Sequence, residues 1–261
     1  MADYASLTRA PARALLAIAL FLACDSEEPA EEPPINLPPR DAGDPVDAAA
    51  DTIVEPVVDA GPDVEAPIDP CAASNLVACF PFEESVSDTK GNLVNAEVTN
   101  VTFVEGKKDK GASLAPGSKI RFTATDKLAT PAATVDAWIK LLPTFNAEAT
   151  VYEVDERHVM TIEADRTLLC ASPGGADRGL QVTLDKWVHV ACVFGGGNAL
   201  AYVDGNPSGT SPFTSFPAAA PVVAEIGNDT PDGTRPFIGA IDSLRIFSVV
   251  RTPAEIKEAA K

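Results

Sequence analysis

The chain has 261 residues, five cysteines and a formal net charge of −18. This acidity argues against a nucleic-acid partner, because nucleic acids are bound through their phosphates by basic protein surfaces. The length allows one domain of middle size and additional segments, and changes in local composition divide the chain into three parts.

The first 24 residues have the pattern of an export signal. Arg9 and Arg13 precede the apolar run Ala14–Ala23, which is too short to span a bilayer but suits a secretory signal peptide. The run ends in FLAC, which resembles a bacterial lipobox, so we predict that Cys24 is lipidated and anchors an exported protein to a bacterial cell envelope. The alternative is an ordinary cleaved signal peptide.

Residues 25–70 have the composition of a disordered linker. They contain 14 Asp or Glu against the single Arg40, with ten prolines and no aromatic residue. Such a segment cannot build a hydrophobic core, and its like charges and prolines keep it extended. We interpret it as a stalk that holds the following domain away from the membrane, with an acidic recognition tail as the alternative.

Short apolar or alternating runs fill the chain from residue 71 to residue 261, separated by Gly, Pro, Asn and Asp. The runs are LVACFPF, KIRFTAT, TVDAWIKL, TVYEV, HVMTIEA, TLLCAS, LQVTL, WVHVACVF, ALAYVD, VVAEIG and AIDSLRIF. Their spacing predicts an all-β antiparallel sandwich. A short terminal helix is also predicted, because Thr252 can cap it, Pro253 suits its first position and Glu255 completes a capping box.

Five sequence blocks in this region resemble one superfamily. They are LVACFPFEESVSDTKGN, VEGKKDKGASL, TVDAWIKL, KWVHVACVFGGGNALAYVDGNPSG and IGNDTPDGTRPFIGAIDSLRIFSVVRTPAEI. Together they resemble the laminin G-like domains of the concanavalin A-like superfamily, over about residues 71–256. The resemblance implies a jelly-roll β-sandwich of two antiparallel sheets that binds an extracellular glycan or protein. The same jelly roll also carries glycoside hydrolases, so the fold alone does not decide the function.

The acidic stretch VYEVDERHV raises the possibility of catalysis. Retaining β-glucanases of this architecture carry Glu-x-Asp-x-Glu on one strand, where alternate residues share a face. Glu153 and Asp155 match the first two positions, but the third is Arg157, and Glu156 would point to the opposite face of a regular strand. We therefore interpret the acids as a solvated turn and predict no catalytic residue.

The two histidines, His158 and His189, are too few for a zinc site of several histidines. His189 lies in the W-x-H-V-A strand of the resembled superfamily, and we interpret it as structural.

A hydrolase remains the alternative function, and a purely structural envelope protein without a soluble ligand is the third.

Four cysteines remain in the exported domain if Cys24 is lipidated, and four allow three pairings. We favour Cys71 with Cys79, which would pin the linker to the first strand, and Cys170 with Cys192, which would join two strands of one region. The second pairing carries a geometric condition, because an intervening strand in the same sheet would place the cysteines too far apart.

The resemblance also implies a possible calcium ion, which takes six to eight oxygen ligands. One candidate set is Asp88 with Asn92 and Asp242. A second is the loop that contains Asn228, Asp229 and Asp232. The alternative for both sets is that Asx residues occur there as turn formers. The sequence thus predicts a lipid-anchored module for an extracellular glycan or protein, and it assigns no ligand identity and no oligomeric state.

Overall fold

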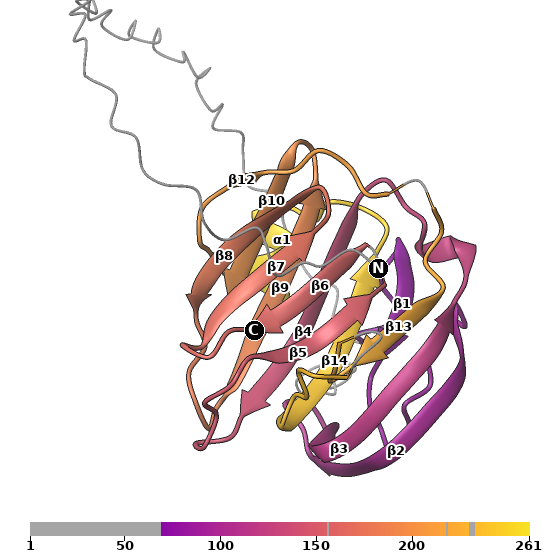
Figure 1. The fold of residues 1–261 in the computed structure, drawn as a ribbon, viewed down its shortest axis with the longest axis vertical. Helices are drawn as coiled ribbons and strands as arrows, with labels where there is room; N and C mark the ends of the chain where they lie inside the picture. The colour runs from indigo at the N-terminus through magenta and orange to yellow at the C-terminus, as the bar shows by residue number, and fades with distance from the viewer. Residues whose placement is uncertain (1–68, 156, 218, 230–232) are drawn as a thin grey trace, which may run out of the picture. The chain divides into compact units, whose positions relative to one another are not determined.

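The computed structural model describes residues 69–155, 157–217, 219–229 and 233–261 (Figure 1). The predicted signal peptide with Cys24, nearly all of the predicted linker, Glu156 and Asp232 lie outside the described residues. The described part of the chain contains no helix that is both long and apolar enough to cross a membrane.

The described elements are almost all strands, as predicted. In chain order they are β1 (Leu76–Phe80), β2 (Leu93–Glu105), β3 (Lys110–Ala124), the 3-10 helix η2 (Asp126–Leu128), β4 (Ala133–Leu141), β5 (Ala149–Val154), β6 (His158–Ile162), β7 (Thr167–Ser172), β8 (Gly175–Gln181), β9 (Trp187–Gly195), β10 (Asn198–Val203), β11 (Asn206–Pro207), β12 (Ser211–Pro212), β13 (Val223–Ile226), β14 (Gly239–Phe247) and the helix α1 (Pro253–Ala259).

The strands form two layers that are joined by hydrogen bonds through β3. The order along the sheet is β11-β10-β9-β4-β14-β3-β13-β5-β6-β7-β8, with β1 beside β14, β12 beside β10 and β2 beside β3. The start of β3 pairs with β14 and its end pairs with β13. We call the strands from β11 to β14 the first layer and those from β13 to β8 the second layer.

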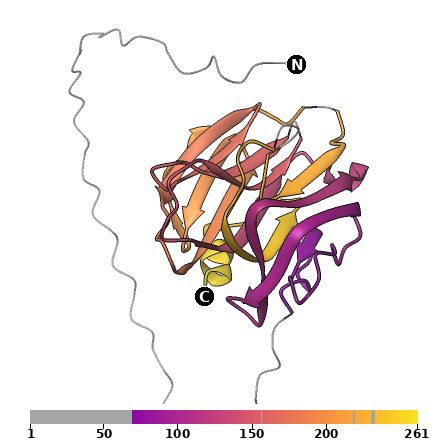
Figure 2. The same cartoon turned by 60° about the horizontal axis from the view of Figure 1, so that its bottom comes forward.

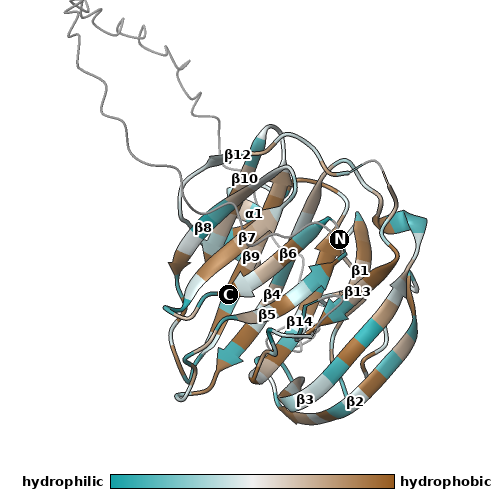
Figure 3. Ribbon diagram, viewed as in Figure 1, coloured by the Kyte–Doolittle hydropathy of each residue, from teal (hydrophilic) through white to brown (hydrophobic). Residues whose placement is uncertain are grey.

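The two layers face each other, as Figures 1 and 2 show for β7 and β8 over β9 and β10. One continuous apolar core lies between them. Strand alternation builds this core: in β3, Ile120 and Phe122 are buried while Arg121 lies between them on the other side of the strand. Figure 3 shows the same alternation as bands of hydrophobic and hydrophilic residues along β2 and β3.

The terminal helix α1 begins as predicted. The side chain of Thr252 accepts a hydrogen bond from the backbone N–H of Glu255, and the Glu255 carboxylate accepts one from the backbone N–H of Thr252, so the capping box is complete. Ile256 is fully buried against Ala191 and Tyr202 on the outer face of the first layer. The helix therefore covers part of that face.

Both expected disulfide pairings are present. Cys71 is bonded to Cys79 and Cys170 to Cys192. Cys170 lies in β7 and Cys192 in β9, which belong to opposite layers. The second bridge thus crosses the core between the layers instead of joining strands of one region, and the geometric condition on strands within one sheet does not apply.

Candidate functional site

The outer face of the first layer holds a buried cluster of charges beside α1. Asp136 has no exposed surface, and its two carboxylate oxygens accept hydrogen bonds from Arg245 Nε at 2.7 Å and Arg251 Nη1 at 3.2 Å. His189 Nε2 is 3.9 Å from Asp136. Burial lowers the pKa of His189 to about 4 despite the opposing charge of Asp136, so His189 is a neutral, buried residue of this cluster.

The loop before β3 covers the neighbouring part of the same face. Lys107 Nζ lies 4.1 Å from the centre of the Trp138 ring. The backbone N–H of Lys108 donates to Asp242 Oδ2, and Ser243 Oγ donates to Asp242 Oδ1. With α1 on one side and this loop on the other, the outer face of the first layer is largely closed.

The first calcium candidate, Asp88, is a turn-forming residue in this structure. Its Oδ1 accepts hydrogen bonds from the backbone N–H groups of Cys79 and Lys90, and its Oδ2 accepts from those of Asn92 and Leu93. Four donors occupy the lone pairs that a calcium ion would need. Asp88 therefore closes the turn between β1 and β2.

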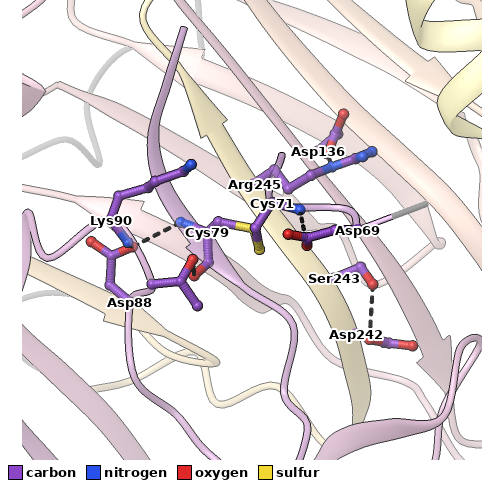
Figure 4. The surroundings of a disulfide bond; sticks show 10 residues. Asp69, Cys71, Cys79, Asp88, Lys90, Asp136, Asp242, Ser243 and Arg245 are labelled. Atoms are coloured by element: carbon purple, nitrogen blue, oxygen red, sulfur yellow. Dashed lines mark hydrogen bonds and ion pairs between the residues drawn. A yellow bond between two sulfur atoms is a disulfide. The ribbon is translucent and has the colours of Figure 1, made fainter. Parts of the chain in front are cut away.

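The structure does not bring the first predicted set together. The Asn92 side chain donates to the carbonyl of Val77. Asp242 lies in β14 with both oxygens hydrogen-bonded, and Figure 4 shows it well separated from Asp88, with the Cys71–Cys79 bridge between them in the view. These three side chains do not form a calcium ligand set.

The second predicted set is likewise organised by protein donors. Asp229 Oδ1 accepts from the backbone N–H groups of Thr234 and Arg235, and its Oδ2 accepts from Thr234 Oγ1 and Arg235 Nε. Burial is the largest single influence and raises the pKa of Asp229, but these hydrogen bonds and the charge of Arg235 together outweigh it and lower the pKa. Asp229 thus holds its loop together, and Asp232 lies outside the described residues.

The acids of the stretch VYEVDERHV are divided between a strand and a turn, so the turn interpretation holds for Asp155 and not for Glu153. Glu153 lies in β5 and Asp155 in the turn that connects β5 to β6. Arg157, at the third position of the hydrolase pattern, is 3 % exposed, and its guanidinium donates to the carbonyls of Thr130 and Pro217. Arg157 therefore ties two loops to the hairpin.

A row of charged side chains crosses the outer face of the second layer and the adjoining strands β3 and β2. Glu97, Arg121, Glu225 and Glu153 lie in register on β2, β3, β13 and β5. Arg121 Nη1 is 3.7 Å from Glu225 Oε1. Glu225 is only 3 % exposed, and burial raises the pKa of its carboxyl although Arg121 lowers it. The charges of Asp229 and Glu97 raise this pKa further.

A charged pocket opens near one end of this layer. It has a volume of about 330 Å³ and is lined by Glu148, Glu163, Ala164, Asp165 and Arg178. Arg178 Nη2 donates to Glu163 Oε1, while the other oxygen, Oε2, is buried with no hydrogen-bond partner among the described residues. Burial raises the pKa of Glu163 despite the charge of Arg178, and the charges of Asp165 and Glu148 raise it further.

An apolar hollow of about 80 Å³ borders the same loop between β4 and β5. Its lining residues are Leu142, Thr144, Phe145, Asn146, Ala147, Ala149, Pro236 and Ile238. Glu148, which lines the charged pocket, follows Ala147 and precedes Ala149 of the hollow. Arg235, which precedes Pro236, binds Glu148 Oε1 through Nη1 at 3.0 Å. The Arg235–Glu148 ion pair therefore marks the boundary between the pocket and the hollow.

Sequence reasoning did not find the pocket residues. Glu148, Glu163 and Arg178 are isolated charges beside turns or on an edge strand, and such residues usually form solvated surface. Only the pairing of β5 with β6, and of β7 with β8, brings them to one end of the layer. The missing signal is thus one of tertiary structure and not of residue type.

Comparison with known families gives one match. Residues 114–257 match the family model Laminin_G_3, described as the concanavalin A-like lectin/glucanases superfamily. No curated protein matches the chain.

Solved structures share the fold at low sequence identity. Domain 4 of an extracellular arabinanase from Geobacillus stearothermophilus, in complex with arabinotriose, is 22% identical with a TM-score of 0.60, and the match covers 72% of this chain and 98% of that one. The binding domain of botulinum neurotoxin DC, in complex with rat synaptotagmin II, is 16% identical with a TM-score of 0.55. That match covers 71% of this chain and 51% of the neurotoxin chain. Trypanosoma rangeli sialidase is 14% identical with a TM-score of 0.57, and the match covers 72% of this chain and 33% of the sialidase chain.

Proposed function

Because the chain belongs to the concanavalin A-like lectin/glucanases superfamily, we propose that it is a non-catalytic module that binds extracellular carbohydrate. The observation that carries the proposal is the charged pocket with its adjoining apolar hollow. Carbohydrate presents hydroxyl groups and apolar C–H faces close together, so a binding site needs polar and apolar surfaces side by side. The charged pocket is an open depression at the surface and not an enclosed cavity.

The placement of the acidic residues supports binding over hydrolysis. A retaining glycosidase needs two carboxyl groups about 5 Å apart on either side of the scissile bond. Glu153 lies on β5 and Asp155 in the following turn, while the third position of the hydrolase pattern holds the buried Arg157. The carboxylates that line the pocket have binding roles in this proposal, and none is assigned a proton transfer.

We place the domain at the bacterial cell envelope. The support is in the sequence, where a signal-like segment ends in the lipobox-like FLAC and an acidic, proline-rich stretch follows. Lipidation of Cys24 would hold the chain on a membrane surface, and residues 25–70 would carry the domain away from it. A partner at this position is a glycan of the cell's surroundings or of the envelope itself.

A glycan array tests the proposal. The full chain, purified in detergent, is applied once with calcium and once with a chelator. We expect a signal on a defined subset of glycans that persists with the chelator, because Asp88 and Asp229 are saturated by protein donors. The same glycans are then incubated with the chain and analysed for new reducing ends, and we expect none. A silent array contradicts carbohydrate binding, and released reducing ends would establish a hydrolase instead.

A further inference from the structure

Arg251 and the helix α1 that follows it are attached to the outer face of the first layer, and we call this segment, residues 251–259, the latch. The Arg251 guanidinium donates to Asp136 Oδ2 at 3.2 Å and to the carbonyl of Glu255 at 3.3 Å, so it joins the helix to the sheet. Ile256 adds an apolar contact with the sheet. A helix of seven residues is unstable by itself, so α1 depends on these contacts.

His189 lies beside the carboxylate oxygen that holds the latch. Its Nε2 is 3.9 Å from Asp136 Oδ2, the oxygen that also accepts from Arg251. The His189 side chain has no exposed surface, and neither ring nitrogen has a hydrogen-bond partner among the described residues. A neutral imidazole in this position leaves Asp136 to the arginines, whereas an imidazolium carries a positive charge and an N–H on each nitrogen.

Protonation of His189 would place three cations around one carboxylate. Arg245 Nε binds the other oxygen of Asp136, Oδ1, and this arginine is fixed in β14 between β4 and β1. Arg251 lies outside the strands, so it is the cation that can leave. The charged groups that act on the His189 ring are Asp136 of β4, Asp204 of the turn after β10, Arg245 of β14 and Arg251 of the latch, and Lys107 Nζ lies over the neighbouring ring of Trp138.

Burial opposes the protonation of His189 while the latch is closed. It lowers the pKa of His189 to about 4, although the charge of Asp136 raises it. An imidazole in water has a pKa of about 6.5. A proton therefore binds more strongly to a form in which the ring is hydrated, and the stability of the closed latch falls as the pH drops from about 6.5 toward 4.

We propose that His189 is an acid-sensitive release for the latch: when its ring takes up a proton, it displaces Arg251 from Asp136, and α1 leaves the outer face of the first layer. Release exposes the apolar patch that Ile256 covers, which is formed by Ala191, Val193 and Tyr202. This inference goes beyond carbohydrate binding and does not depend on it, because none of these residues lines the pocket or the hollow.

Amide hydrogen exchange of the full chain at pH 7 and pH 5, corrected for the intrinsic effect of pH, tests the release. The two pKa values predict that the open population rises about 20-fold between these conditions. We expect the protection of α1 to fall by that factor while β4 and β9 keep theirs, which separates release from global unfolding. The capping carboxylate of Glu255 stays ionised at pH 5, because hydrogen bonds from Thr252 lower its pKa.

Two histidine variants locate the proton. His189→Gln keeps a polar side chain that does not titrate, and we expect the protection of its α1 to change by less than about twofold over the same pH range. His158→Gln is the matched control, because His158 is the other histidine of the chain and is also buried, but it stacks on Phe194 of the core. This variant should retain the full response of α1.

The unmodified chain carries the test if a variant fails to fold. Its two histidines give two sets of ring signals in an NMR titration, and contact with Trp138 assigns His189. We expect protonation of His189 and loss of protection in α1 to share one midpoint, between about pH 4 and 6.5. The release is overturned if His189 is protonated while α1 stays protected, if α1 and β4 lose protection together, or if His189→Gln responds to pH as the unmodified chain does.

Discussion

Asp136→Asn is expected to lower the free energy of unfolding by about 3 to 5 kcal/mol, the usual cost of removing one partner from a buried ion pair. Asp136 has no exposed surface and is hydrogen-bonded to Arg245 and Arg251, whose side chains are only 13% and 14% exposed. Asparagine keeps the size of the side chain but removes its charge. Both arginines would then lie largely buried without a counter-charge beneath the C-terminal segment.

The loss is measured by urea unfolding, followed through tryptophan fluorescence. Asp185→Asn is the matched control, because Asp185 is also paired with a basic residue, Lys140, but its side chain is 64% exposed. We expect the control to change the free energy of unfolding by no more than about 0.5 kcal/mol. Equal and small effects of both variants would mean that the buried ion pairs of Asp136 contribute no more to the free energy of unfolding than an exposed pair does.

Removal of the bridge between the layers has the second largest expected effect. The double variant Cys170→Ala with Cys192→Ala opens a loop with a sequence separation of 22. Chain-entropy arguments predict a loss of about 3 kcal/mol in the free energy of unfolding. The bridge also fixes β7 against β9 across the core, so the two layers should separate more easily in the variant.

The other bridge provides the internal comparison. Cys71→Ala with Cys79→Ala opens a loop with a separation of 8, so its expected loss is roughly 1 kcal/mol smaller. Denaturant titration of both double variants under oxidising conditions shows which variant loses more free energy of unfolding. A larger loss for the Cys71–Cys79 pair would show that the bridge at the entrance to the domain matters more than the one across the core.

The all-β fold could be predicted because several local signals agree. Most of the strands are alternating or wholly apolar runs, and the jelly-roll family match confirms the resemblance. Asp204 and Gly205 follow β10 and both have positive φ, 48° and 73°, which is the conformation that makes Asp-Gly a recognisable hairpin signal in a sequence. The capping box of α1 was predicted from Thr252 and Glu255, and both of its hydrogen bonds are present.

Among the longer strands, β2 was not predicted and β8 was predicted only at its end, and the two-residue strands β11 and β12 were not predicted either. β2 lies beside β3 alone and is exposed over most of its length, so burial imposes no apolar pattern on it. Register shifts near Asn95 and Asn100, both with positive φ, also interrupt its alternation. β8 is a sheet edge with two glycines, and the predicted run LQVTL contributes only Leu180 and Gln181 to it.

The candidate site could not be predicted, because it depends on distant segments. Asp88, Asn92 and Asp242 looked like ligands by residue type, but each is used by the backbone or side chains around it. Glu148 and Glu163 were not predicted as site residues, although the structure places them in one pocket. Residue type shows what a side chain can bind, whereas the site depends on which partners the fold leaves unsatisfied.

Amide hydrogen exchange tests the central claim most directly, with the full chain measured alone and with the glycan that gives the strongest array signal. We predict added protection in residues 142–149, 163–166 and around Arg235, which border the pocket and the hollow. Exchange in residues 105–110 should not change, because that loop already covers the first layer. Protection confined to residues 105–110 and the turn around Asp88 would contradict the account and move the binding site to the other face.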